Sequence, residues 1–259
     1  KTQRNDDIYE VDMLANKDGY IPVATNMPFY LQVAQGLIPG YSFNHKFGAV
    51  QALGINTTGT LWDIDDTVYP WASWDTAGTI TLTRANAADA SKVVTVQGLD
   101  SNYNEASEDI TLTAASGNAG TVSWKRVNRM FMITDGGANV GHVTAVKGGT
   151  NVARITADKG QTLMAVYTVP AGKTGYLLKG VMTAQASADA SGQMLVRYFG
   201  SDVFRIGHSF EVTGSGGEYQ YEFAIPIPVP EKSDIDVRAI TRSNNGRYTA
   251  AFDILLVDN

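Results

Sequence analysis

The stretch Gln161-Thr-Leu-Met-Ala-Val-Tyr-Thr-Val-Pro-Ala-Gly-Lys-Thr-Gly-Tyr-Leu-Leu-Lys-Gly-Val181 holds the clearest local pattern in the chain. Two apolar and aromatic runs, Leu163 to Val169 and Tyr176 to Val181, flank a segment that begins with Pro170 and contains two glycines. Proline fixes φ and glycine tolerates a positive φ, so this segment favours a turn. The pattern predicts a β-hairpin at the start of a C-terminal β-sandwich.

Further strand patterns follow the hairpin at short intervals. The run Tyr219 to Ile225 alternates aromatic or apolar residues with Gln, Glu and Ala, and the chain ends on the apolar run Phe252 to Val257. Pro226, Pro228 and Pro230 are expected to stop the first of these strands from pairing further. Closely spaced strands of this kind are typical of antiparallel sandwiches, so we expect residues 159–259 to form a jelly-roll-like β-sandwich domain.

A second β unit precedes the hairpin. Thr79 to Thr83 and Asp109 to Thr113 alternate apolar and polar residues, as half-buried strands do. The clusters Asp135 to Asn139 and Lys147 to Asn151 each contain paired glycines, which is typical of short hairpin connections. We therefore predict a first β-sandwich domain over residues 46–158, and an all-β fold class of two antiparallel sandwiches.

Residues 1–45 do not have the pattern of a domain. The segment Tyr20 to Gly40 combines three prolines with many apolar side chains, which excludes a long helix. Ordering a backbone costs about 1 to 2 kcal/mol per residue, and apolar burial is needed to offset that cost. We expect an extended N-terminal arm that lies on the chain's own domains or on a neighbouring subunit. Its expected interface residues are Phe29, Tyr30, Leu31, Leu37 and Ile38.

Composition narrows the classes of function. The 259 residues carry a net charge of −6 and include no cysteine. The negative charge and the lack of a basic cluster argue against nucleic acid as a partner. The absence of cysteine excludes disulfides and thiolate chemistry. No apolar run reaches the ~18 residues that a membrane span needs, and the start of the chain, Lys1 to Asp7, lacks the apolar core of a signal peptide.

No motif in the sequence predicts catalysis or a cofactor. Gly172-Lys173-Thr174 resembles the end of a phosphate-binding loop, but Tyr167 stands where that motif needs its first glycine, and a strand follows in place of a helix. We expect turn chemistry there, with Lys173 exposed and without a ligand. The three histidines, His45, His142 and His208, have no metal-ligand spacing. The prediction is a protein that is not an enzyme, with no catalytic residue, no cofactor and no metal.

The densest carboxylate cluster is Asp63, Asp65 and Asp66. Calcium-binding loops need more oxygen ligands and usually a glycine at the sharp turn, so a calcium ion at these residues is kept only as an alternative. A pair of catalytic carboxylates is a weaker alternative, because the distance between the two groups decides that chemistry and the sequence does not contain it.

Three of the four tryptophans lie close together, in a cluster with one tyrosine: Trp62, Tyr69, Trp71 and Trp74. Such a cluster either fills a domain junction or a subunit interface, or stacks on sugar rings. We favour packing or an interface over glycan contact.

A resemblance to a known family runs through much of the chain. The matching stretches are Gly36 to Ser42 leading into His45 to Gly48, Leu61 to Asp63, Val94 to Asn104, Gly160 to Thr174, Pro230 to Asp234 and Phe252 to Asn259. In these stretches the chain resembles a family of β-rich virion structural proteins of tailed bacteriophages, including marine and cyanobacterial phages.

The resemblance implies a structural protein located on the virion, at the capsid or tail surface, and it brings no catalytic motif. The expected function is a capsid decoration or cement protein that binds the particle through its arm and displays a β-sandwich outward. Its expected partners are copies of itself, with a trimer favoured, and the major capsid protein or other virion proteins. The alternative is a receptor- or glycan-binding appendage that uses the aromatic cluster on a host surface glycan. A hydrolase of surface polysaccharide is a third hypothesis, for which no paired acidic site is found.

Overall fold

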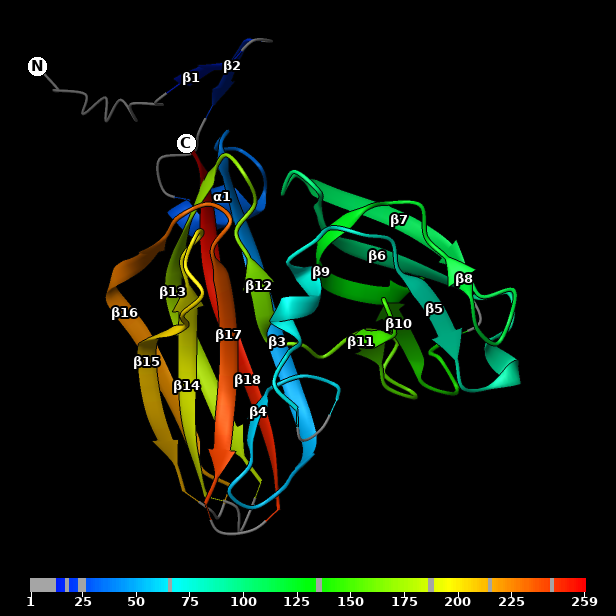
Figure 1. Cartoon of the computed structure of the whole chain (residues 1–259). Coiled ribbons are helices and arrows are strands. Elements are labelled where there is room, and N and C mark those ends of the chain that lie inside the picture. The colour runs from blue at the N-terminus through cyan, green and yellow to red at the C-terminus, as the bar shows by residue number, and fades with distance from the viewer. Residues whose placement is uncertain are drawn as a thin grey trace, which may run out of the picture.

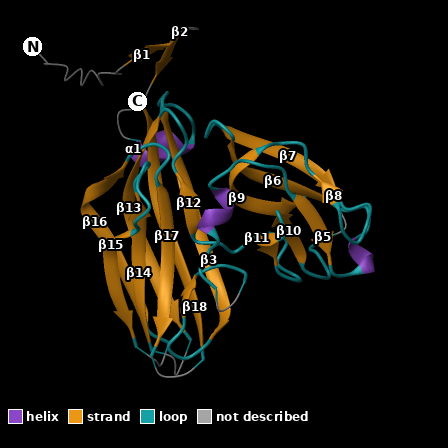
Figure 2. Ribbon diagram, viewed as in Figure 1, coloured by secondary structure: helices purple, strands orange, loops and turns teal. Residues whose placement is uncertain are grey.

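The structure is a computed structural model that describes residues 13–16, 19–22, 27–64, 67–133, 137–185, 189–213, 216–242 and 245–259. Strands dominate it, and every pair of neighbouring strands in this part of the chain is antiparallel. Helical structure there is limited to α1 (Phe29–Ala34) and two 3-10 turns, η1 (Trp71–Trp74) and η2 (Ala87–Asp89). The prediction of an all-β chain built of antiparallel sheets is confirmed (Figure 2).

Two sheets face each other in the larger body of the molecule (Figure 1). One contains, in spatial order, β16 (Glu218–Val229), β13 (Lys173–Ala184), β18 (Gly246–Asp258) and β3 (Tyr41–Leu53). The other contains β12 (Val166–Thr168), β17 (Asp234–Thr241), β14 (Ala190–Arg197) and β15 (Arg205–Val212), and β4 (Thr58–Thr60) also pairs with β17. Phe252 and Leu177 from the first sheet and Val237 and Met194 from the second share one apolar core.

Two smaller sheets form the second body. One contains β11 (Thr150–Ile155), β10 (Val143–Lys147), β5 (Thr81–Arg84) and β8 (Asn118–Ala119). The other contains β7 (Glu105–Thr111), β6 (Val93–Asp100) and β9 (Trp124–Met132). Leu82, Val96 and Trp124 lie in their common core. The predicted turn between β10 and β11 is present, and Gly148 and Gly149 both have the positive φ that a tight hairpin requires.

The hairpin predicted over Leu163 to Val181 is wrong in its pairing. β12 pairs with β17, whereas β13 pairs with β16 and β18, so the two runs belong to different sheets. After β12, Val169 still bonds to the segment just before β17. Its N–H donates to the carbonyl of Ser233, and its carbonyl accepts from the N–H of Lys232. The turn that follows, with Gly172 at a φ of +74°, carries the chain from one sheet to the other. Local turn chemistry predicts the change of direction but not the partner strand.

The strands do not follow the predicted ranges of the arm and the first domain. β3 begins at Tyr41, inside the predicted arm, and pairs with β18 along most of its length. β4, from the predicted first domain, pairs with β17. Residues 41–60 therefore supply strands to the sheets of the C-terminal body, and the predicted boundary at residues 45 and 46 falls within β3. The finer division into two jelly-roll-like sandwiches stays a prediction.

The prediction that prolines end the strand after Ile225 is also wrong. β16 continues to Val229, and Pro228 is paired with Tyr176 of β13. β16 lies at the edge of its sheet, where a missing N–H on the outer side costs no ladder hydrogen bond.

The N-terminal segment has two described elements ahead of the sheets. β1 (Met13–Asn16) and β2 (Gly19–Pro22) pair as a two-stranded ribbon, and α1 follows as a single short helix. The helix lies at the same end of the larger body as the C-terminus (Figure 1). Its first residue, Phe29, packs edge-on against Tyr41 at the start of β3, with ring centroids 5.6 Å apart.

Candidate functional site

The predicted aromatic cluster lies inside the molecule. Trp62, Tyr69, Trp71 and Trp74 belong to the core of the second body, and the most exposed of them, Trp71, is only 6% exposed. Tyr69 contacts Trp62 and Trp71 edge-on, and the indole N–H of Trp74 donates to its hydroxyl at 2.8 Å. Stacking on a sugar needs an exposed ring face, so these residues pack within the chain and offer no glycan platform.

The cluster borders a polar junction between the two bodies. Alternate residues of β17 divide between two environments: Ile235 and Val237 enter the core of the larger body, while Asp234 and Asp236 meet the second body. Asp234 accepts two hydrogen bonds from the buried guanidinium of Arg126 on β9, at 2.9 and 3.0 Å. A buried carboxylate is tolerated when such donors satisfy its oxygens.

The second carboxylate binds the aromatic cluster directly. Asp236 accepts hydrogen bonds from the indole N–H of Trp71 at 2.8 Å and from the hydroxyl of Thr60 at 2.9 Å, and Arg238 donates to it at 2.7 Å. Burial raises the pKa of Asp236, and the Arg238 guanidinium and the Trp71 donor oppose that rise. Both carboxylates of the pair thus have structural partners. Asp234 also lines a surface pocket, but its oxygens are bonded to Arg126 and Arg197.

Asp63, the one described member of the predicted carboxylate cluster, is also buried. It accepts hydrogen bonds from the Thr156 hydroxyl, at 2.8 Å, and from the main-chain N–H of Leu163. Burial raises the pKa of Asp63 to about 7. Asp65 and Asp66 lie outside the described residues. Within those residues, no three His, Asp or Glu side chains come together in a group that could hold a metal ion.

The remaining residues singled out in the sequence do not form one site. The histidines are separate: His45 pairs with Asp253, and His142 accepts from the N–H of Ala157 at 3.1 Å. His208 stacks on a tyrosine of β16. Lys173 is half-buried and bonded to Asp258 at 2.6 Å, which corrects the expectation of an exposed side chain.

Three of the predicted arm residues are exposed apolar side chains on α1. Phe29 is 48%, Tyr30 64% and Leu31 39% exposed, while Leu37 and Ile38 are half-buried. Exposed apolar residues that lie together are a feature of protein interaction sites. No helix in the described part of the chain has the length and apolar character needed to cross a bilayer.

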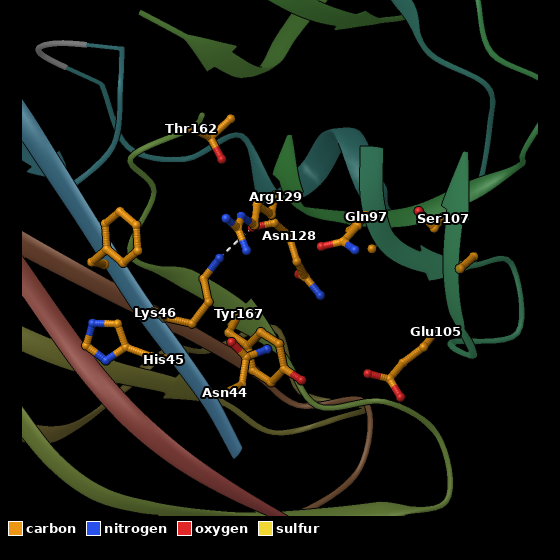
Figure 3. Close-up of a pocket in the computed structure, with 13 residues that line it drawn as sticks. Asn44, His45, Lys46, Gln97, Glu105, Ser107, Asn128, Arg129, Thr162 and Tyr167 are labelled. Atoms are coloured by element: carbon orange, nitrogen blue, oxygen red, sulfur yellow. Dashed lines mark hydrogen bonds between the residues drawn. The ribbon is translucent and has the colours of Figure 1, made fainter. Parts of the chain in front are cut away.

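A cavity of about 380 Å³ opens between the two bodies (Figure 3). Its lining comes from both. The larger body contributes Asn44, His45, Lys46, Phe47 and Tyr167, and the second body contributes Gln97, Gly98, Glu105, Ala106, Ser107, Asn128 and Arg129, with Thr162 bonded to Met130 of β9. The walls are therefore mostly amide, hydroxyl and cationic side chains.

Lys46 is the unusual member of this cavity, because it is only 6% exposed. Its ammonium donates to the main-chain carbonyl of Asn128, and no carboxylate among the described residues pairs with it. Burial and the nearby Arg129 lower the pKa of Lys46 to about 7. Sequence reasoning missed this residue, since one lysine in a strand has no distinguishing spacing and only its burial marks it.

Comparisons with known proteins give no family assignment. No protein-family profile matches the chain, and no curated protein sequence is similar to it. Among solved structures, a chain of infectious bursal disease virus, Gx strain, is 10% identical over 90% of this chain and 77% of its own length, with a TM-score of 0.23. A chain of the cowpea mosaic virus top component, which consists of naturally occurring empty particles, is 7% identical over 71% of this chain and 84% of its own, with a TM-score of 0.22. These chains come from virus particles, but TM-scores this low do not define a shared fold.

Proposed function

We propose that this chain is a non-enzymatic structural protein of a bacteriophage virion, and specifically a capsid decoration or cement protein attached through its N-terminal segment. The sequence resemblance to β-rich phage virion proteins supports the phage assignment. The observation that carries the mode of attachment is the exposure of three large apolar side chains on the short helix α1, Phe29, Tyr30 and Leu31.

The position of this helix suits an anchor. α1 and the C-terminus lie at one end of the larger body, and the turn between β3 and β4 lies at the other (Figure 1). A chain held by α1 and the segment before it would present that opposite end to solvent. Three large apolar side chains would then lose contact with water on binding, which favours association by roughly 25 cal/mol per Å² of apolar area removed.

The proposed assembly is a homo-oligomer, with a trimer as the state that fits a local three-fold position of a capsid shell. Closed symmetry is the rule for soluble homo-oligomers, and it lets each copy present the same anchor to the shell. We also propose that the chain divides into two β-sandwich domains and that one of them is displayed outward. The two separate apolar cores support this division.

Binding to particles tests the proposal. Purified chain would be added to capsids that lack it, and the bound fraction would be measured by co-sedimentation. We expect the variant Phe29→Ser, Tyr30→Ser, Leu31→Ser to lose binding while it folds normally. Ile55→Ser is the matched control, because Ile55 is an exposed apolar residue in the turn between β3 and β4. Equal binding by the triple variant, or a wild-type chain that neither binds particles nor oligomerises, would contradict the proposal.

A receptor- or glycan-binding appendage is the second candidate, and one observation favours it. The aromatic cluster does not supply the site, since its rings are buried. The polar cavity between the two bodies is open, however, and contains Lys46, which pairs with no carboxylate in the described part of the chain. Adsorption of particles to host cells, measured with and without the protein, separates the two candidates: a decoration protein changes particle stability, whereas an appendage changes adsorption.

A further inference from the structure

The cavity between the two bodies contains a buried lysine that no carboxylate of the described residues pairs with. Lys46 is buried at its wall, and the only bond partner of its ammonium in the described part of the chain is one main-chain carbonyl. Arg129 stands beside it, and its guanidinium donates to the side-chain oxygen of Gln161 at 2.6 Å. Buried charges in proteins are normally paired, because an isolated ion pays a large desolvation cost. A buried lysine beside an arginine at an open cavity therefore favours an anionic group from outside the chain, which would stabilise the charged form of the lysine.

The other ionisable groups of the cavity do not supply that anion. His45 is bonded to Asp253, so the carboxylate of Asp253 is already engaged, and it also pairs with Lys179. Glu105 is the one carboxylate in the lining, and it comes from the opposite side of the space in Figure 3. No salt bridge joins it to Lys46 or to Arg129 among the described residues.

The rest of the lining suits a ligand with several hydroxyl groups. The side chains of Gln97 and Asn128 converge with Lys46 and Glu105 on the same space (Figure 3). Amide groups both donate and accept hydrogen bonds, and a carboxylate accepts from hydroxyls. The volume of about 380 Å³ is within the range of small-molecule sites, which is about 300 to 1,000 Å³.

We propose that this cavity binds an acidic sugar, a hexuronic acid or a hexuronic acid unit of a polysaccharide, with its carboxylate held by Lys46 and Arg129 and its hydroxyls by the amides and Glu105. An acidic peptide fits the lining less well, because the carboxylate of Glu105 repels further negative charges. A small inorganic anion would use the two cations but leave the amides of Gln97 and Asn128 without a ligand partner.

Titration of the protein with three small molecules, followed by calorimetry and by NMR shifts, tests the proposal. The probes are glucuronate, glucose and sulfate. We expect glucuronate to bind wild-type protein, glucose to bind at least tenfold more weakly, and sulfate to be weaker than glucuronate. Lys46→Met and Arg129→Gln should each reduce glucuronate affinity tenfold or more. Arg205→Gln is the control, because Arg205 is an exposed arginine on β15, outside the cavity lining.

The outcomes separate the ligand classes. Sulfate binding as tight as glucuronate binding would show a bare oxyanion site and overturn the assignment to a sugar. If glucuronate does not bind, or if it binds both variants as tightly as the wild type, the proposal that this cavity is a ligand site is wrong. Arg129 is exposed, so Arg129→Gln keeps the test valid even if Lys46→Met alters folding. Particle binding through α1 is a separate measurement, so failure here leaves the decoration proposal unaffected.

Discussion

Arg126 and Asp234 form a two-bond salt bridge across the junction of the two β bodies, although 108 residues separate them in the chain. Asp234 also accepts hydrogen bonds from Arg197 and from the hydroxyl of Thr168, so its carboxylate is fully satisfied by donors. The junction therefore contains a strongly bonded carboxylate at Asp234, in addition to Asp236. The buried indole of Trp71 lies beside it, with its ring centroid 5.5 Å from the Arg126 guanidinium.

Removal of the Arg126–Asp234 salt bridge should destabilise the folded protein. We expect Arg126→Ala to lower the free energy of unfolding by about 2 to 3 kcal/mol, because it removes two charge-assisted hydrogen bonds from a buried carboxylate that keeps Arg197 as a charged partner. Denaturant unfolding measures this. Arg205→Ala, at an exposed arginine, is the control and should change stability by less than about 0.5 kcal/mol. Similar values for the two variants would show that the bridge does not hold the bodies together.

Asp63 should make stability fall as pH rises from about 4 to 7. Its folded pKa is raised from 3.8 to about 7, so in this window the folded state keeps a proton that the unfolded state has released. Asp63→Asn removes the titration while its amide can still accept from Leu163 N–H and donate to Thr156. Unfolding free energies at several pH values between 4 and 7 should decline for the wild type more than for the variant; parallel curves would refute this assignment.

Lys46 should make stability rise with pH above pH 7, opposite in sign to the effect of Asp63. Its folded pKa is lowered from 10.5 to about 7, so between these values the unfolded state binds the extra proton and stability rises with pH. Lys46→Met should flatten that rise and stabilise the protein at pH 7 by about 1 to 3 kcal/mol, as replacement of buried charges by apolar side chains often does. Thermal unfolding at pH 7 and 9 tests both statements, and a destabilised variant at pH 7 would contradict them.

Gly48 should not tolerate a side chain. A Cβ there would lie 2.0 Å from the carbonyl oxygen of Leu61 and 2.3 Å from the nitrogen of Ala165, and both are backbone atoms that cannot move freely. Gly180 is the matched strand glycine, because its nearest neighbour is the flexible end of Met194 at 3.3 Å. We expect Gly48→Ala to cost about 2 to 3 kcal/mol more than Gly180→Ala, as overpacking does. Equal costs in denaturant unfolding would show that the sheets can separate at this point.

Parts of the candidate site were within reach of the sequence. The spacing of Trp62, Trp71 and Trp74 predicted an aromatic packing cluster, and the apolar residues of α1 predicted an interface. Lys46 and the Arg126–Asp234 bridge were not predictable, because each depends on side chains that meet only after the two bodies pack. The same limit applies to Asp63, whose raised pKa comes from burial beneath residues distant in the chain.

The sequence by itself determined many of the strands and turns, because alternation of apolar residues and the φ preferences of glycine and proline are local properties. It predicted the β10–β11 hairpin for that reason. It did not mark β3 or the true end of β16. Only the tertiary structure decided that β12 and β13 lie in different sheets, and that β3 joins β18. Strand partners depend on which distant apolar faces bury each other, and that choice is made by the core as a whole.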